Sequence, residues 1–163
     1  MPPVICIVGR SGVGKTTLIE RLVAEFKRRG YRVATIKHSP MGFQLEPSAK
    51  DTRRHIRAGS DTVIISSPQE LALIRPQDHD ASLEEILNLL GDGFDIVLAE
   101  GFKESRAPKI EVLRQASDGE PLYRTGELIA VVSETPMNKT IPHFAPDDIS
   151  SVADLIERML VKR

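Results

Sequence analysis

The sequence has a single cysteine, Cys6, among its 163 residues, and it has no tryptophan. One cysteine excludes an intramolecular disulfide and a metal cluster held by several thiolates. No apolar run reaches the roughly 18 residues that a membrane-spanning helix needs. The first residues also lack the basic and apolar regions of a signal peptide. We therefore expect a cytoplasmic protein that does not insert into a membrane.

The sequence also lacks a dominant charge, because 22 lysines and arginines face 23 aspartates and glutamates, for a formal net charge of −1. No overall field favours nucleic acid or an anionic membrane surface, and we expect neither as a partner. With 40% hydrophobic and 28% charged residues, the composition is that of a globular protein. The length fits one domain over residues 1–163, and any anion must be bound by a local arrangement.

A glycine-rich segment, Gly9–Thr16 (G-R-S-G-V-G-K-T), follows the apolar run Val4–Val8. Its spacing, G-x-x-x-x-G-K-[ST], is that of a phosphate-binding P-loop. The glycines let several backbone N–H groups turn toward one point, and the helix that follows adds its positive end. Lys15 then reaches the β- and γ-phosphates, and the Thr16 hydroxyl can ligate Mg²⁺. We predict that a nucleotide is bound by Gly9, Ser11, Gly12, Val13, Gly14, Lys15, Thr16 and Thr17, with Lys15 in a catalytic position.

Apolar patterns along the rest of the chain predict alternating strands and helices. Continuous apolar runs are typical of strands buried on both faces of a parallel sheet. Runs in which apolar and polar residues alternate are typical of half-buried strands. The predicted strands are 4–8, 32–37, the hairpin 62–66 and 69–74, 95–102, the period-two run 110–114, and 128–132 as the last. We therefore predict an α/β fold, three-layer and P-loop NTPase-like, with a mostly parallel sheet, helices on both faces and a β-hairpin extension.

Glu100 ends one of these predicted strands. P-loop proteins need a second acidic group on a neighbouring strand, which holds Mg²⁺ directly or through water. We predict that Glu100 has this catalytic and metal-binding position together with Thr16; the alternative is a strand-end carboxylate that faces solvent. Asp95, at the start of the same strand, is expected at the opposite edge of the sheet.

A polar segment, 38–47, leaves the end of the strand 32–37, at the sheet edge where α/β proteins bind ligands. The short helix after it carries Arg53, Arg54 and Arg57. These arginines form either a solvated face or an anion clamp, and the sequence favours neither. A basic loop with Lys103, Arg106 and Lys109 is expected at the same edge.

The residues alone do not fix the base of the nucleotide. Asn138-Lys139 is the first half of an N-K-x-D guanine motif without its aspartate, and a D-x-x-G switch is absent. Glu134, at the tip of the strand 128–132, could offer a carboxylate to the base instead. Two functions stay open: a small-molecule kinase that uses ATP, and an NTP-binding protein that assists a partner enzyme. A GTPase that delivers metal is a third, weakened by the lack of a cysteine or histidine cluster.

Four further segments are I-K-H-S-P-M-G-F at 36–43, K-D-T-R-R-H-I-R-A-G at 50–59, A-E-G-F-K at 99–103 and P-K-I-E-V-L-R at 108–114. With the P-loop and the strand 128–132, they resemble the MobB family, the molybdopterin-guanine dinucleotide biosynthesis adapter proteins, over nearly the whole chain. The residues within the family's motifs are Lys37, His38, Asp51, Arg53, His55, Glu100 and Lys103. Some members have a histidine-rich run after the lysine, which this chain lacks.

The resemblance implies a homodimer that binds GTP with Mg²⁺ and hydrolyses it weakly at most. It also implies partner enzymes: the nucleotidyltransferase that joins GMP to molybdopterin, and other molybdenum cofactor enzymes. It adds His38 and Asp51 to the residues that contact a cofactor. It also gives the basic helix a purpose, since Arg53, Arg54, Arg57 and Lys103 could receive the phosphate of molybdopterin. The hairpin at 62–74 is our candidate for the dimer surface, because an exposed strand edge invites pairing.

Overall fold

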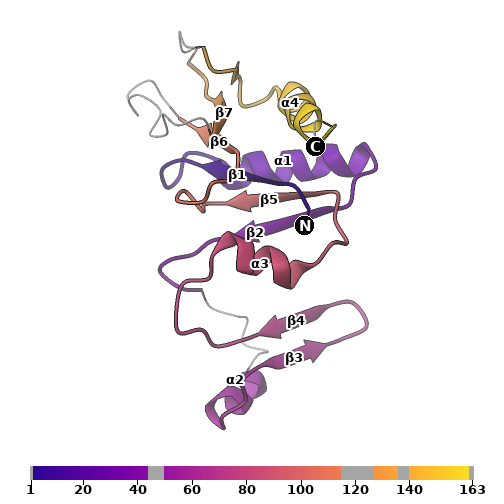
Figure 1. Ribbon diagram of the computed structural model, residues 1–163, viewed down its shortest axis with the longest axis vertical. Helices are drawn as coiled ribbons and strands as arrows, with labels where there is room; N and C mark the ends of the chain where they lie inside the picture. Colours follow the sequence, from indigo (N-terminus) through magenta and orange to yellow (C-terminus); the bar gives the residue numbers. More distant parts are fainter. Residues whose placement is uncertain (1, 44–49, 115–126, 136–139, 162–163) are drawn as a thin grey trace. The chain divides into compact units, whose positions relative to one another are not determined.

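The computed structural model describes residues 2–43, 50–114, 127–135 and 140–161, which Figure 1 traces. They form two compact units, one from residues 1–38 and 82–163 and the other from residues 39–81, and each is treated by itself below. The elements are β1 (Val4–Val8), α1 (Lys15–Arg28), β2 (Val33–Lys37), α2 (Lys50–Arg57), β3 (Val63–Ser66), β4 (Leu71–Ile74), α3 (Leu83–Leu90), β5 (Ile96–Glu100), β6 (Lys109–Val112), β7 (Leu128–Val132), β8 (His143–Phe144) and α4 (Ile149–Val161).

The first unit is built on a six-stranded sheet in the order β2-β5-β1-β6-β7-β8. Neighbouring strands are parallel throughout, which confirms the predicted α/β fold. β5 lies between β2 and β1, so the carboxyl ends of these strands meet. Glu100 is in register with Lys37 on one side and with Ile7 on the other. This register brings the end of β5 to the loop that follows β1.

Helices cover both faces of this sheet, with α1 and α4 on one side and α3 on the other (Figure 1). The apolar residues of α1 recur every three or four positions, so Leu22 and Phe26 share one face, and both are fully buried. Leu87 of α3 is buried against the opposite face of the sheet. Each such side chain contributes about 1.5–3 kcal/mol by leaving water. The core therefore holds the strand ends in fixed positions.

Two expectations about the later strands are wrong. β6 does not alternate: Lys109–Val112 are all buried, because β6 lies between β1 and β7 and the buried lysine has partners. The Lys109 ammonium donates to the backbone carbonyls of Ser105 and Ala107 and pairs with Glu127 at 2.7 Å. The strand at 128–132 is also not the last, since the two-residue strand β8 pairs with it in parallel.

The second unit contains α2 and the predicted hairpin, in which β3 and β4 pair antiparallel. Its turn is closed by the Ser67 N–H, which donates to the Glu70 carbonyl at 2.8 Å. Val63 and Thr52 are its buried residues among those described. Its large apolar side chains are otherwise mostly exposed: Met41, Phe43, Ile64, Ile65, Leu71 and Leu73.

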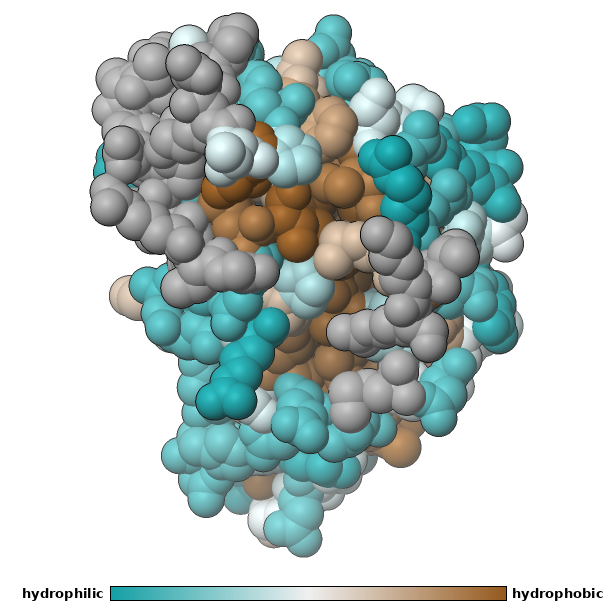
Figure 2. Space-filling view, turned by 45° about the horizontal axis from the view of Figure 1, so that its top comes forward, coloured by the Kyte–Doolittle hydropathy of each residue, from teal (hydrophilic) through white to brown (hydrophobic). Residues whose placement is uncertain are grey.

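None of the helices in the described ranges is long and apolar enough to cross a membrane. In the view of Figure 2, apolar residues show in the middle of the face and hydrophilic residues surround them. This distribution agrees with the sequence composition, in which hydrophobic and charged residues are both plentiful.

Candidate nucleotide-binding site

The loop between β1 and α1 takes a backbone path that its glycines make possible. Gly9, Gly12 and Gly14 have φ values of 141°, 76° and 107°, in the region that L-residues with side chains avoid. A Cβ on Gly9 would also lie 2.5 Å from the carbonyl oxygen of Val112, at the end of β6. Glycine is therefore required at this position by both conformation and space, and β6 supports the loop from beneath.

The N-terminus of α1 has no side chain to satisfy its free N–H groups. Its N-cap is Gly14, and its first turn contains no acidic residue. α3 shows the usual solution: the Ser82 side chain accepts from the N–H of Glu85, the Glu85 carboxylate accepts from the N–H of Ser82, and Glu84 adds a negative charge. The first turn of α1 thus offers unpaired donors and the positive end of a dipole, an arrangement that suits a phosphate.

Lys15 is held where it can complete this cradle. Its ammonium donates to the carbonyl oxygens of Gly9 at 3.1 Å and Arg10 at 2.7 Å. An ammonium has three protons, so one donor remains for an anion inside the loop. The loop therefore fixes the position of a positive charge next to the N–H groups of α1.

Thr16 and Glu100, the predicted metal ligands, are brought together. The Thr16 hydroxyl donates to Glu100 Oε2 at 3.0 Å, and Lys37 Nζ lies 3.4 Å from the same oxygen. The Glu100 side chain is 15% exposed, whereas that of Lys37 is 64% exposed. The carboxylate is therefore nearly enclosed, with a hydroxyl and an ammonium as neighbours.

This pair of oxygen ligands suits a hard cation. Mg²⁺ prefers oxygen and usually takes one or two protein ligands, with water and phosphate oxygens completing its octahedron. Within the described ranges, no group of three or more histidine, cysteine, aspartate or glutamate side chains could hold a metal by itself. Thr16 and Glu100 would hold Mg²⁺ only together with a phosphorylated ligand.

The loop after β5 is packed against His38. The His38 N–H donates to the Glu100 carbonyl at 3.0 Å, and the rings of His38 and Phe102 lie 4.9 Å apart. Gly101 has φ 94°, and a Cβ there would be 3.2 Å from the Cβ of His38. The described contacts of His38 thus support the backbone around Glu100; contact between His38 and a cofactor stays a prediction.

The end of β7 has a buried polar anchor. The Ser133 hydroxyl donates to the Thr135 carbonyl at 2.8 Å and lies 2.8 Å from His143 Nε2. A hydroxyl has one proton, so His143 Nε2 must donate to it. The anchor fixes the segment that carries Glu134, which is exposed. A role for Glu134 toward the base stays a prediction.

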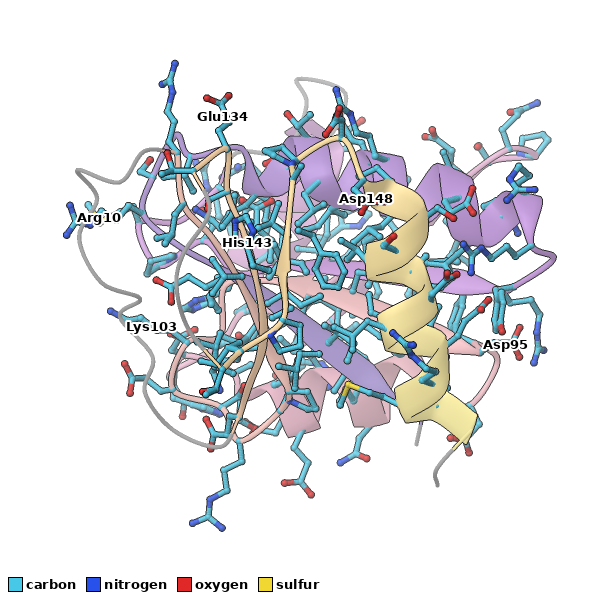
Figure 3. All side chains as sticks on the ribbon, turned by 90° about the horizontal axis from the view of Figure 1, so that it is seen from above. Arg10, Asp95, Lys103, Glu134, His143 and Asp148 are labelled. Carbon is cyan, nitrogen blue, oxygen red and sulfur yellow. The ribbon has the colours of Figure 1, made fainter. Side chains whose placement is uncertain are left out.

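Figure 3 shows Arg10 and Lys103 extending from one side of the first unit and Asp95 at the other. Lys103 is exposed, and its contact with an anion stays a prediction. Asp95 lies at the start of β5 as expected, where hydrogen bonds from the Arg32 guanidinium and N–H hold the pKa of its carboxyl at about 2. Lys109 cannot join an anion clamp, because it is fully buried and already bonded.

The other predicted residues, Asp51, Arg53, Arg54 and Arg57, belong to α2 in the second unit. Arg54 Nη1 lies 3.4 Å from Asp51 Oδ1, and both side chains are mostly exposed. Arg53 and Arg57 line a pocket with Phe43, Ile56 and Ile74. Asn138 and Lys139, the half-motif for guanine, lie outside the described residues.

Sequence reasoning missed several neighbours of these sites. The sequence marks Lys37 only as part of a family motif, whereas its register opposite Glu100 brings the two side chains together. The Ser133–His143 bond depends on β8, which has no hydrophobic period. Phe43 could have been found, since an aromatic residue in a polar loop before a basic helix is a candidate for ligand contact.

A parallel sheet with an uncapped glycine loop after its first strand, and a carboxylate at the end of the neighbouring strand, defines the P-loop nucleotide-binding fold of the α/β class. The family model of MobB, molybdopterin guanine dinucleotide synthesis protein B, matches residues 4–134, and the chain belongs to this family.

Individual proteins agree with this assignment. The chain is 35% identical over 160 residues to a molybdopterin-guanine dinucleotide biosynthesis adapter protein of Haemophilus influenzae, covering 97% of this chain and 89% of the relative. It is 29% identical to the Escherichia coli protein of the same description, covering 100% and 96%. A crystal structure of molybdopterin-guanine biosynthesis protein B superposes with a TM-score of 0.79 at 30% identity, covering 97% and 99%.

Proposed function

We propose that this protein is a GTP-binding adapter in the synthesis of molybdopterin guanine dinucleotide, which holds GTP and Mg²⁺ for the nucleotidyltransferase that joins GMP to molybdopterin. Family membership and the descriptions of its relatives support the pathway. The contact between Thr16 and Glu100, beside the uncapped N-terminus of α1, is the observation that carries nucleotide binding.

In this proposal the backbone of Gly9–Thr17 and the Lys15 ammonium bind the phosphates. Thr16 and Glu100 hold Mg²⁺, which would neutralise charge on the phosphate oxygens. Lys37 lies at the same carboxylate and adds a positive charge near the terminal phosphate. Because the chain has no D-x-x-G switch, we expect it to hold GTP and to hydrolyse it weakly at most.

Guanine recognition would fall to Glu134. A carboxylate can accept hydrogen bonds from guanine N1 and N2, whereas the edge of adenine offers it only the exocyclic amine as a donor. Glu134 is the second residue after β7 and follows Ser133, whose side chain is held by Thr135 and His143, and this position supports the role.

We also propose that the protein acts as a homodimer and that the hairpin forms the dimer surface. A two-stranded hairpin has two free edges and is marginal on its own. Ile64 and Leu73 are cross-strand partners on one face, and they are 60% and 38% exposed. A second copy of the same face would bury them.

Nucleotide binding is tested by titrating the protein with GTP and with ATP, each with and without Mg²⁺, by calorimetry. Lys15→Ala should weaken GTP binding at least about thirtyfold, since truncating one partner of a buried charge pair costs about 2–5 kcal/mol. Lys27→Ala, at the other end of α1, is the matched control and should bind GTP normally. Normal GTP affinity in Lys15→Ala would refute the P-loop assignment. Preference for ATP with phosphoryl transfer to a metabolite would favour a small-molecule kinase instead.

A further inference from the structure

The second unit contains a pocket of about 240 Å³ between α2, the hairpin and the start of the loop before α2. Arg53 and Arg57 of α2 line it together with Phe43, Ile56 and Ile74. The lining therefore combines apolar side chains, an aromatic ring among them, with the side chains of two arginines. Such a combination is typical of small-molecule sites, where apolar walls give affinity and a few polar groups fix orientation.

The two arginines lie four positions apart on α2, so they are neighbours on one face of the helix. Neither has an ion-pair or hydrogen-bond partner in the described part of the chain, whereas Arg54 of the same helix contacts Asp51. Like charges at this spacing destabilise a helix by a few tenths of a kcal/mol. The helix dipole favours cations in the last turn but does not explain why both line the same concavity. A bound anion would remove the repulsion and use both side chains.

We infer that this pocket binds the phosphate monoester of a flat fused-ring compound. The guanidinium groups of Arg53 and Arg57 would take the phosphate, for which their planar donor sets are well suited. The ring would lie against Phe43, Ile56 and Ile74. Arg54 does not line the pocket, so of the three arginines of α2 only Arg53 and Arg57 are expected to bind the phosphate.

The ring is a pterin, and the phosphate is that of molybdopterin; this identification rests on the function proposed above. The nucleotide has its own site at the P-loop of the first unit, so the pocket remains for the second substrate of the same reaction. A volume of about 240 Å³ lies just below the roughly 300–1,000 Å³ of pockets for drug-sized ligands. It suits one ring system with a single phosphate better than a nucleoside triphosphate.

The test uses neopterin monophosphate, a fluorescent pterin phosphate ester, titrated against the full-length protein by fluorescence anisotropy. The wild-type protein should bind it, and neopterin without the phosphate should bind at least about tenfold more weakly, because the charge-assisted hydrogen bonds are lost. Arg53→Ala/Arg57→Ala should weaken binding of the phosphate ester by about tenfold or more. Phe43→Ala should weaken binding of both pterins.

Arg54→Ala is the matched control, with the same substitution on the same helix outside the pocket, and it should bind neopterin monophosphate normally. Equal affinity in the wild type and in Arg53→Ala/Arg57→Ala would overturn the inference, provided that both have the same circular dichroism melting curve. Competition by GMP with an inhibition constant equal to the dissociation constant of neopterin monophosphate would overturn the pterin assignment. If inorganic phosphate bound as tightly as neopterin monophosphate, the proposed contribution of the pterin ring to binding would be wrong.

The same proteins separate this inference from the proposed function. Lys15→Ala should lose GTP and still bind neopterin monophosphate, and Arg53→Ala/Arg57→Ala should show the reverse. If the wild type binds GTP but not neopterin monophosphate, the pocket inference fails and the GTP-binding function stands. If the wild type binds the ester but not GTP, the proposed nucleotide function fails.

Discussion

The two units of this protein use the same residue types in opposite ways. In the first unit, the Arg29 side chain is 15% exposed and bonds Glu25, Asp154 and Glu157, so that it joins α1 to α4. In the second, Arg53 and Arg57 face a pocket without a described acidic partner. Arg29 is therefore satisfied within the first unit, whereas Arg53 and Arg57 of the second unit are available to a ligand.

The apolar side chains of the two units also differ in how far they are exposed to solvent. Leu22 in the first unit is completely buried, whereas Leu71 in the second is 70% exposed. A short helix and a two-stranded hairpin enclose little core, and exposed apolar surface of this kind marks interaction sites. The difference is consistent with the proposed dimer surface and ligand pocket, which both lie in the second unit.

The largest effect is expected from charging the hairpin face. Ile64→Asp/Leu73→Asp should raise the dimer dissociation constant at least about hundredfold, because a charge buried without a partner costs several kcal/mol. The protein should become a monomer by analytical ultracentrifugation and keep a folded circular dichroism spectrum, since both side chains are exposed in the monomer. Its melting temperature should fall only by the stabilisation that the dimer contact supplies.

Leu89→Asp gives the control for this change, because Leu89 is 58% exposed but belongs to α3 of the first unit. It also replaces an exposed leucine by aspartate, which adds one negative charge in place of two, and it should leave the dimer intact. A dimer that survives Ile64→Asp/Leu73→Asp would remove the hairpin from the interface, and a loss of dimer in Leu89→Asp would place the contact in the first unit.

A smaller effect is expected at the nucleotide site of the first unit. Glu100→Gln keeps the shape of the side chain and an acceptor for Thr16 but loses the charge that attracts a cation. The gain in GTP affinity caused by Mg²⁺ should fall about tenfold, the size of one charge-assisted contact. Without Mg²⁺ the variant should bind GTP as well as the wild type or better, because a carboxylate near the phosphates repels them.

Calorimetric titration with and without Mg²⁺ measures both quantities. Glu104→Gln, an exposed carboxylate of the loop after β5, is the matched control and should change neither. If Glu100→Gln responded to Mg²⁺ like the wild type, Glu100 would be a structural carboxylate bonded to Thr16 and Lys37.

The elements of this fold could be predicted because local sequence determines them. Val4–Val8 is a continuous apolar run, Ser82 and Glu85 form a capping box, and the P-loop is a single segment. Lys109 could not be placed, because a lysine in a strand suggests exposure and its partner Glu127 lies in a distant segment. The short strand β8 has no pattern at all.

The candidate sites, too, combine features that local sequence predicts with features that depend on distant segments. Glu100 was predicted because it ends an apolar run, and the register of β1, β2 and β5 was then needed to show that Thr16 and Lys37 share its carboxylate. The pocket depends on Phe43 and Ile74, which lie on either side of α2 in the sequence. Contacts between such distant segments are set by the tertiary fold and leave no mark in the local sequence pattern.

The smallest effect is expected from the paired arginine of the first unit. Arg29→Met should lower the free energy of unfolding by about 1 kcal/mol at neutral pH, since partly exposed ion pairs contribute a few tenths to one kcal/mol each. Arg28→Met is the control: its side chain is 71% exposed and contacts Glu25 alone among the described residues, so its effect should be smaller.

The difference in the free energy of unfolding between the wild type and Arg29→Met should disappear at acidic pH. Hydrogen bonds from Arg28 and Arg29 lower the pKa of Glu25 from an ordinary 4.5 to about 2. Because the pKa is lower in the folded state, the stabilisation is complete above pH 4.5 and is lost as the pH falls toward 2. Urea titrations of the wild type and Arg29→Met at several pH values should therefore converge within this range. A gap that stays constant down to pH 2 would show that Arg29 stabilises α1 and α4 by packing of its aliphatic stem, and not by charge.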